Sequence, residues 1–447
     1  MICLIKLNIQ GVLSMEERLK VKKATYHLWT FLTSKLVGAF GAQVYSFAIS
    51  FYILQMTGSA TSFAMNLICS ILPRTVMAPF VGYMADRYSR KMIIISSQII
   101  STLAILGLLL VNISFGLSLI AIYITTIVLS IASTFSGIAF SSSISSLVDE
   151  KRIQKAMSMN QMSISIATIA SPAVGGLLYG TVSMSTFLII YMMASIIAVL
   201  LESTMDFKLF AKRQEVVEGE PKESMLESMK AGLSYVKLQP VLVAMIWISL
   251  LVNFFFGAFQ VGYSYILIEK LKMPSEHFGL TEGAFAIGML VLSICLSIRK
   301  EQKYPFIISK WGIIVMGGIM IIIGLPLMLT LSANGILIFY MIVMFIFGAM
   351  IILVNTPIGV FMQKTIDDDY KGRVFSILET MAMALMPLGM VLYGFLYDLF
   401  SPQWILFVSG GLLIVSVVIL ARPSVIRKAH PEFRQGKVMH AEPVTEK

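Results

Sequence analysis

The sequence predicts an all-α membrane protein with twelve transmembrane helices in two pseudo-symmetric six-helix halves. Of its 447 residues, 57% are hydrophobic and only 13% are charged, and the mean hydropathy is +0.86. Soluble domains carry about 25% charged residues. A helix needs roughly 20 apolar residues to cross a hydrocarbon core of about 30 Å. Twelve apolar runs of that length follow one another along the chain.

Short polar connections separate the apolar runs. The connections at 55–59, 113–115, 182–183 and 330–333 are so short that the helices they join must be antiparallel neighbours. An even number of spans places both chain ends on one side of the membrane. The predicted spans are residues 30–54, 60–82, 92–112, 116–142, 156–181, 184–204, 241–266, 278–298, 306–329, 334–361, 374–398 and 402–421.

A charged polar segment divides the spans into two sets of six. Its stretch SMLESMKAGLSYV has apolar residues near helical spacing, which favours an amphipathic helix on the membrane surface, with a flexible linker as the alternative. Met15 is an alternative start to Met1, in which case residues 1–14 are not translated. The predicted domains are a cytoplasmic segment at 1–29, a first half at 30–205, the linker at 206–240, a second half at 241–421 and a cytoplasmic tail at 422–447.

Basic residues predict the orientation of the chain. Lys and Arg resist translocation and therefore accumulate in cytoplasmic loops. They are frequent before the first span and in every second loop, whereas the remaining loops contain only Lys270 and Lys272. Both termini are therefore expected in the cytoplasm. The net charge of +10 reflects this topology, because its basic residues are spread over short loops without a nucleic-acid-binding motif.

Several classes of site are not expected. Two of the three cysteines, Cys69 and Cys295, lie inside predicted spans, which argues against disulfides and a metal site. The four histidines lie outside the spans or at their edges, so no intramembrane catalytic histidine site is expected and the chain is not predicted to be an enzyme. No G-x-x-x-x-G-K-[ST] sequence occurs, and no cofactor is predicted. An ion gradient is then the expected energy source.

The stretch GYMADRYSRK lies between the second and third spans. It resembles the G-x-x-x-D-R-x-G-R-[RK] motif of the major facilitator superfamily, with Ser89 where that motif has its second glycine. The stretch ASPAVGG in the fifth span is similar to a Gly-Pro-rich motif of the superfamily's exporters, with Ser171 where glycine is usual. QMTGSATSFAMNLICSILPRTVMAPFVGYMADRYSRK and DYKGRVFSILETMAMALMPLGMVLYGFLYD resemble the drug and macrolide exporter branch. Related branches export siderophores or other small molecules.

Charged residues of the first motif suggest a reversible inner gate. Asp86 is predicted to accept hydrogen bonds from the N-terminus of the eleventh helix, where free amides attract an anion. Arg87 or Arg90 is predicted to reach Asp149 or Glu150. The alternative is that these charges only enforce orientation. The predicted gate residues are Gly82, Asp86, Arg87, Arg90, Lys91, Asp149 and Arg373.

Glycine and proline occur inside the fifth and eleventh spans. They permit close helix approach and local bending, so they suit either hinges or static packing. The residues concerned are Pro172, Gly175, Gly176, Pro387 and Gly389.

The resemblance implies a central cavity lined by helices 1, 4, 7 and 10. These spans contain aromatic residues and scattered amides, which suits a bulky amphipathic molecule, although core packing or lipid contact is as good an interpretation for any single residue. The predicted cavity residues are Gln43, Phe47, Ser136, Asn253, Phe256, Gln260 and Asn355.

Proton coupling normally needs an ionisable group inside the membrane. The chain offers Lys35, Arg74, Glu202, Glu282, Glu379 and Asp398. Glu202 and Asp398 lie at span ends where water can solvate them, as do Glu282 and Glu379. Arg74, Glu379 and Glu282 are the predicted coupling candidates.

These observations lead to one functional prediction. The chain is expected to be a secondary active transporter that exports a hydrophobic or amphipathic, drug- or macrolide-like molecule by alternating access, in exchange for protons. It is expected in a bacterial inner membrane, functioning as a monomer. The alternatives are export of a siderophore or another metabolite, and import or uniport on the same fold.

Overall fold

The computed structural model is helical, and no strand occurs in the part of the chain that it describes. The structure describes residues 2–148, 150–207, 209, 233–299, 302–329, 331–366, 374, 377, 378, 381 and 384–429. Helices are the expected solution, because a lipid-exposed chain must satisfy its backbone polar groups internally. Most of the predicted linker lies outside the described residues, and positions 233–238 of it are helical.

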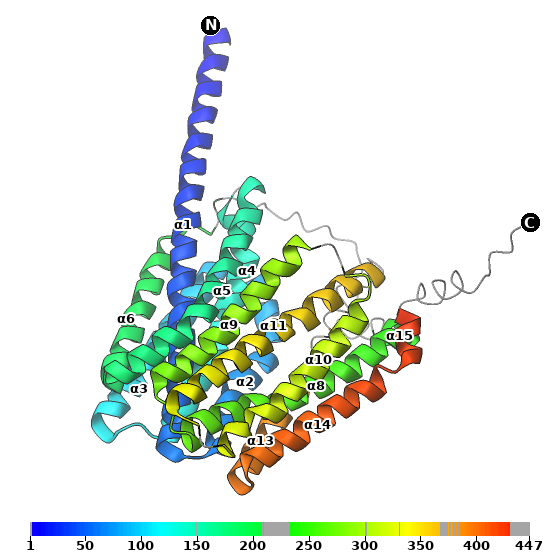
Figure 1. Cartoon of the computed structure of the whole chain (residues 1–447). Coiled ribbons are helices and arrows are strands. Elements are labelled where there is room, and N and C mark those ends of the chain that lie inside the picture. Colours follow the sequence, from blue (N-terminus) through cyan, green and yellow to red (C-terminus); the bar gives the residue numbers. More distant parts are fainter. Residues whose placement is uncertain are drawn as a thin grey trace, which may run out of the picture. The chain divides into compact units, whose positions relative to one another are not determined.

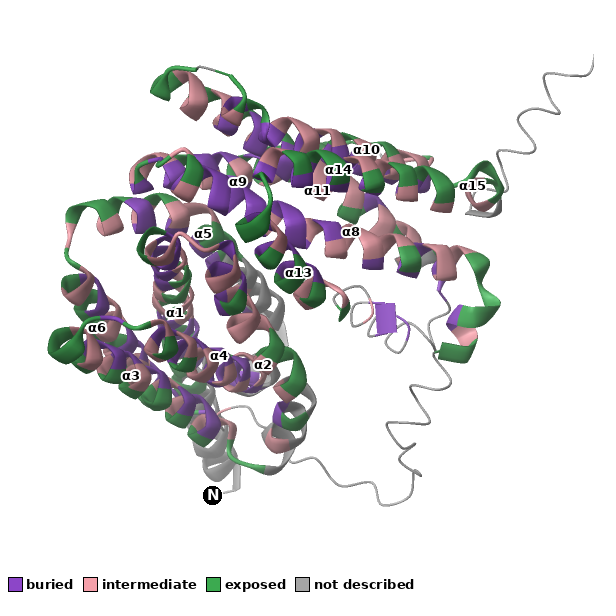
Figure 2. Ribbon diagram, turned by 90° about the horizontal axis from the view of Figure 1, so that it is seen from below, coloured by how far each residue is buried: buried purple, intermediate pink, exposed green. Residues whose placement is uncertain are grey.

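The predicted all-α fold with twelve spans is confirmed. Each predicted span coincides with a long helix, although the eleventh is only partly described. Among the described residues, nine helical stretches are long and apolar enough to cross a membrane by length and composition. Large apolar side chains such as Leu103, Ile113 and Phe395 are more than half exposed, and Figure 2 shows exposed residues in green on many of the helices. Such faces suit contact with lipid.

Unit 1 comprises residues 1–52 and 66–218. Its fourth helix packs against the third, which also packs against the sixth. A buried cluster at one end, with Phe31, Ile94, Phe140 and Met205, joins these elements to the first helix. The helices, seen in Figure 1, are α1 (Ile2–Thr57), α2 (Ala60–Arg87), α3 (Arg90–Phe115), α4 (Leu119–Leu147), α5 (Glu150–Thr181) and α6 (Met184–Ser203).

Unit 2 comprises residues 219–447 together with residues 53–65, which include the end of α1 and the start of α2. We call residues 53–65 the α1–α2 turn segment. Within unit 2, α9 packs on α11, α10 on α14 and α8 on α13. The elements are α8 (Pro240–Tyr265), the π-helix η1 (Ile266–Lys270), α9 (Ser275–Ile298), α10 (Pro305–Ile323), the 3-10 helix η2 (Leu325–Leu327), α11 (Ala333–Thr365), α13 (Met386–Leu399), α14 (Pro402–Leu420) and α15 (Pro423–Ala429).

Helix boundaries differ from the predictions at two places. The first helix begins at Ile2, far before the predicted first span. The eleventh span was predicted at 374–398, and the described residues 374, 377, 378, 381 and 384 are helical, but residue 385 is a turn, after which α13 begins at Met386. Pro387 therefore lies in the first turn of a helix, where its missing N–H and fixed φ are tolerated.

Two glycines allow α9 and α11 to approach closely. A Cβ atom added at Gly288 would overlap the backbone carbonyl of Phe345, and one added at Gly348 would overlap that of Phe285. The backbones therefore pack on each other directly, as small residues permit in membranes. Gly283, on the same helix as Gly288, has open space where its Cβ would lie.

We predict that Gly288→Ala and Gly348→Ala lower the thermal unfolding midpoint of the protein in detergent. Alanine favours a helix by about 1 kcal/mol over glycine, but at these sites overpacking against a carbonyl costs about 1–3 kcal/mol. Gly283→Ala is the matched control, and its midpoint should stay level or rise. Equal midpoints for all three variants would contradict the α9–α11 packing.

Candidate functional site

Unit 1 contains a polar cavity of about 480 Å³ between its helices. All six helices of the unit contribute to its wall. The lining is rich in hydroxyl and amide groups, with aromatic rings and a few charged side chains among them. The volume lies within the range of about 300–1,000 Å³ that is usual for small-molecule sites.

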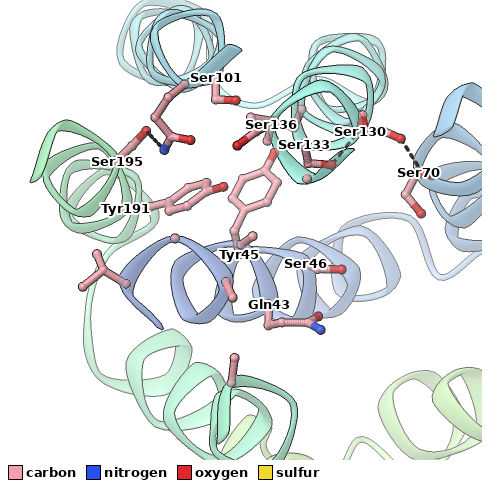
Figure 3. A pocket seen from close by; sticks show the side chains of 18 of the residues that line it. Gln43, Tyr45, Ser46, Ser70, Ser101, Ser130, Ser133, Ser136, Tyr191 and Ser195 are labelled. Atoms are coloured by element: carbon pink, nitrogen blue, oxygen red, sulfur yellow. Dashed lines mark hydrogen bonds between the residues drawn. The ribbon is translucent and has the colours of Figure 1, made fainter. Parts of the chain in front are cut away.

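Two tyrosines form an aromatic wall of this cavity. Tyr45 of α1 stacks on Tyr191 of α6, with ring centroids 5.0 Å apart. Figure 3 shows that Tyr45 points toward Ser133 and Ser136 of α4, whereas Gln43 points away from them. Stacked rings offer an apolar face to a ligand, and the neighbouring hydroxyls offer hydrogen bonds.

Hydrogen bonds between helices hold the polar wall in place. Thr126 Oγ1 of α4 donates to Asn66 Oδ1 of α2 at 2.9 Å, and Ser130 Oγ of α4 donates to the Ser70 carbonyl at 2.5 Å. On the other side, Gln98 of α3 donates to Ser195 Oγ of α6 at 3.1 Å. Polar side chains that face protein inside a membrane need such partners.

One end of the cavity carries opposite charges. Lys35 and Glu202 both line it, and Ser34 Oγ donates to Glu202 Oε1 at 2.7 Å. The Lys35 ammonium lies 4.1 Å from the centroid of the Phe140 ring, which is a cation–π contact. Glu202 is only 3% exposed. This carboxylate is therefore largely buried, whereas its position at a span end suggested full solvation.

The predicted cavity residues of the first half have different environments. Gln43 and Ser136 line the unit 1 cavity. Phe47 does not line it. Its ring covers Gly175 of α5, where an added Cβ would lie 3.0 Å from the ring.

The predicted cavity residues of the second half all lie in unit 2. Asn253 donates to the Ser249 carbonyl of its own helix at 2.9 Å. Phe256 stacks with Phe259 and Phe347. Gln260 is partly buried and Asn355 is exposed. Their contact with a ligand stays a prediction.

The predicted coupling candidates differ in burial and in location. Arg74 is exposed and lines the unit 1 cavity. Glu282 is partly buried in α9 of unit 2. Glu379 lies outside the described residues.

Most of the predicted inner gate is not described at side-chain level. Asp149 and Arg373 lie outside the described residues, as do the side chains of Asp86 and Arg87 in α2. Gly82 is in the same helix. Lys91 Nζ donates to the Met205 carbonyl at 2.9 Å, which joins α3 to the segment after α6 within unit 1. Arg90 is partly buried and has interactions of its own.

The predicted hinge or packing residues lie in close helix contacts. Pro172 is inside α5, and the buried Gly175 and Gly176 follow it. Gly389 of α13 lies against α8, since an added Cβ would contact the backbone of Phe254. Whether they also act as hinges stays a prediction.

Asp398, at the end of α13, caps the N-terminus of α2. Its Oδ1 accepts from Ala60 N at 2.7 Å, and its Oδ2 accepts from Thr61 N at 3.1 Å and from Ser59 Oγ at 2.8 Å. Free amides and the helix dipole make this end favourable for a carboxylate. No pattern in the sequence links positions 59 and 398, so this contact was not predicted.

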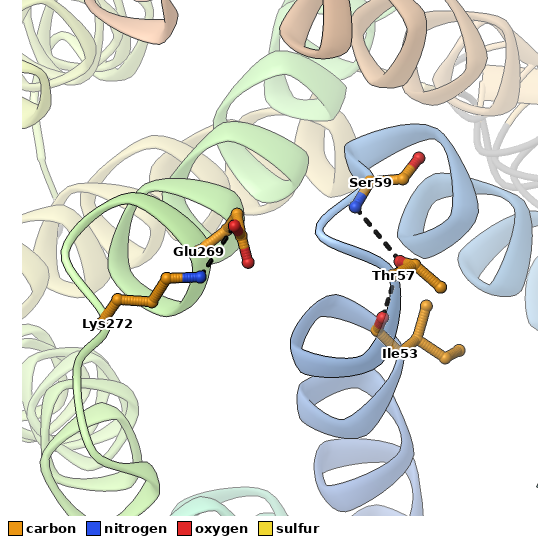
Figure 4. Close-up of polar contacts among 5 residues, drawn as sticks. All are labelled: Ile53, Thr57, Ser59, Glu269 and Lys272. Atoms are coloured by element: carbon orange, nitrogen blue, oxygen red, sulfur yellow. Dashed lines mark hydrogen bonds and ion pairs between the residues drawn. The ribbon is translucent and has the colours of Figure 1, made fainter.

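Local contacts shape the α1–α2 turn segment. Figure 4 shows Thr57, which donates to the Ile53 carbonyl at 2.7 Å and accepts from Ser59 N at 3.1 Å. Gly58 has a φ of 61°, a backbone angle that residues other than glycine rarely adopt. The nearby Glu269 carboxylate pairs with Lys272 at 2.8 Å. The turn is thus held in one conformation.

We predict that the unit 1 cavity admits water. In a cysteine-free background, Gln43→Cys should react at least about tenfold faster with a hydrophilic methanethiosulfonate than Leu103→Cys, because only a hydrated thiol ionises to the reactive thiolate. Leu103 is 58% exposed on α3 and serves as the lipid-facing control. Reaction rates are measured by mass spectrometry. Equal rates would contradict the cavity.

Known proteins resemble this chain along most of its length. The Major Facilitator Superfamily profile matches residues 31–388. The chain is 25% identical over 417 residues to macrolide efflux protein A of Streptococcus pyogenes, covering 93% of this chain and 99% of that protein. It is 23% identical over 380 residues to the staphyloferrin A transporter of Staphylococcus aureus, covering 83% and 89%.

Solved structures share the fold. A POT family transporter in complex with a thioalcohol-conjugated peptide superposes with a TM-score of 0.68 at 13% identity, covering 88% of this chain and 95% of that one. The apolar helices make the chain a multi-pass membrane protein. It is a transporter rather than an enzyme, and it belongs to the Major Facilitator Superfamily, with similarity to the superfamily's drug-exporter branch.

Proposed function

We propose that the protein exports hydrophobic or amphipathic small molecules of the macrolide type. The observation that carries this proposal is the similarity to macrolide efflux protein A over nearly the full length of both chains. A likeness that extends over both halves includes the elements that would bind and move a substrate. The protein is then an exporter of a bacterial cell membrane that functions as a monomer, with both termini in the cytoplasm.

The unit 1 cavity supports an amphipathic substrate. Tyr45 and Tyr191 present stacked rings, while Gln43, Asn66 and the serines of α4 present hydrogen-bonding groups. A bulky molecule would bury its apolar surface on the rings and need few fixed hydrogen bonds. Phe256 and Gln260 of unit 2 stay predicted substrate contacts.

Exchange with protons is the proposed energy source. Lys35, Arg74 and Glu202 place ionisable groups along a cavity inside membrane-spanning helices. Such groups are energetically costly in a membrane, so their presence there suggests a function. At a proton-motive force of about 180 mV, one proton supplies roughly 4 kcal/mol, enough for about a thousandfold substrate gradient.

Alternating access needs contacts that form and break at each side of the membrane. On the inner side we assign them to the motif between α2 and α3, with Asp86 and Arg87. On the outer side we assign them to Asp398, which holds the α1–α2 turn segment on α13. Asp398 is exposed, so water and salt weaken its contacts. A weak contact suits a gate that opens in every cycle.

Export of an anionic siderophore is the second candidate. Two cations, Lys35 and Arg74, line the same cavity, and a multiply charged carboxylate ligand would pair with both. Import or uniport of a metabolite on the same fold is a further alternative. One uptake experiment therefore tests both the direction of transport and the identity of the substrate.

We predict that cells producing the protein accumulate less radiolabelled erythromycin than cells without it, because export lowers the internal concentration. A protonophore should abolish this difference. Uptake is measured by filtration, with a labelled staphyloferrin-type siderophore as the second probe. Equal erythromycin levels in both strains would reject macrolide export. Higher accumulation in the producing cells would identify an importer.

We predict that Asp398→Asn opens the outer side more often. Loss of one exposed charge–dipole interaction, about 0.3–1 kcal/mol, corresponds to an increase of about two- to fivefold in the open population. The increase is measured as faster labelling of Gln43→Cys by an impermeant reagent added outside the cell. Glu276→Gln, at the start of α9, is the matched control. Unchanged labelling in Asp398→Asn would reject the outer contact.

A further inference from the structure

Glu202 is the most buried carboxylate that the structure describes. It lies at the end of α6 and is 3% exposed. Ser34 Oγ donates to its Oε1 at 2.7 Å. Its Oε2 is buried and has no hydrogen-bond donor among the described residues. One oxygen of this carboxyl group is therefore held in place, and the other is unpartnered at the cavity wall.

Lys35 is a basic residue that lines the same cavity as Glu202. Both side chains line the unit 1 cavity, where opposite charges attract, but no direct ion pair joins them in the described structure. The Lys35 ammonium instead lies over the Phe140 ring. Lysine has a long, flexible stem, so its ammonium has two possible partners, the ring and the carboxylate.

The surroundings decide which charge state of Glu202 is stable. An ionised carboxylate at this depth is costly unless a cation pairs with it. The C-terminal end of α6 adds partial negative charge and disfavours the ionised form further. A bound proton removes both costs and allows Lys35 to stay on Phe140.

Other charged side chains of unit 1 lie on α2, on α3 and in the segment after α6. Arg74 of α2 lines the same cavity. Lys91 of α3 is bonded to the Met205 carbonyl, and Asp206 follows α6. The described lining residues of α4 and α5 are uncharged. Lys35 is thus the basic residue next to Ser34, the partner of Glu202.

We propose that Glu202 is the residue that binds and releases the coupling proton, with Lys35 as its alternating counter-ion. In one state the carboxyl is protonated and Lys35 lies over Phe140. In the other, the O–H bond of Glu202 breaks, the proton passes to water in the cavity, and the Lys35 ammonium moves to the carboxylate. Charge inside the cavity then changes by one unit for each proton. This assignment rests on the proposed proton exchange.

Three observations favour Glu202 over the coupling candidates that were predicted from the sequence. Glu202 lies in the cavity that holds the proposed substrate groups, whereas Glu282 lies in unit 2. Its carboxyl has one fixed oxygen and one unpartnered oxygen. Arg74 is exposed, and a guanidinium does not release its proton in proteins.

The first test is a pH titration of the purified full-length protein by infrared spectroscopy, which needs no substrate. We expect a protonated-carboxyl band in the wild type that disappears as the pH rises and is missing in Glu202→Gln. Lys35→Gln should keep the band to higher pH, because the cation that favours ionisation is gone, and Lys35→Arg should restore the wild-type titration. Glu276→Gln is the matched control and should titrate as the wild type does.

A band that persists unchanged in Glu202→Gln would overturn the assignment. So would identical titrations of the wild type and Lys35→Gln. The amide I band and size-exclusion profile of each variant confirm that it is folded. If Glu202→Gln does not fold, Glu202→Asp serves instead, and its shorter side chain should shift the titration.

The second test separates this inference from the proposed function. In proteoliposomes with a pH gradient, Glu202→Gln should lose gradient-driven accumulation of erythromycin, by tenfold or more. If the wild type accumulates erythromycin and Glu202→Gln does so equally, the assignment is wrong while the exporter function stands. If the wild type transports no erythromycin, the exporter function fails, and the infrared titration alone decides the role of Glu202.

Discussion

Hydrocarbon offers no hydrogen-bond partner, and this constraint governs the structure. It forces the backbone into helices and directs apolar side chains toward lipid. It also turns every buried polar group into a group that needs a specific partner. Asn66, for example, receives the Thr126 hydroxyl, and Ser195 receives the Gln98 amide. The polar cavity of unit 1 exists because its hydroxyls and amides hold one another between helices.

The same constraint explains why charge is concentrated in a few places. Glu202 and Lys35 face a cavity rather than lipid, and each has one partner, Ser34 and Phe140 respectively. Asp398 lies at a helix end, where three donors meet its carboxylate. The Glu202 site is deeply buried and suits strong coupling to protonation. The Asp398 site is exposed and suits a contact that is easily broken.

Much of the fold could be predicted because lipid immersion leaves a strong pattern in the sequence. Apolar runs gave the spans to within a few residues at most ends, and the family motifs gave the fold. The turn at residue 385, inside the predicted span 374–398, was not predicted because hydropathy does not register a turn inside an apolar run. The burial of Glu202 was missed for a related reason. Its position at a span end suggested solvation, and only the packing of α1 against it shows otherwise.

Long-range pairing was the least predictable part of the site. Gln43 and Ser136, both polar residues in apolar spans, line the unit 1 cavity, and their contact with a substrate stays a prediction. The Phe47 ring covers Gly175, and because an aromatic residue serves packing and binding equally well, the sequence could not separate these two roles. The contact between Asp398 and the start of α2 joins positions more than 300 residues apart in sequence. No local pattern reports such a contact.

The alternating access proposed above requires unit 1 and unit 2 to move relative to each other during transport. The most direct measurement is the distance distribution between spin labels at Tyr88→Cys, in the α2–α3 loop, and Lys303→Cys, in the α9–α10 loop, recorded in nanodiscs at high and low pH. Both positions are exposed. The account predicts two distance populations whose ratio changes with pH. A single distribution that is the same at every pH would contradict it.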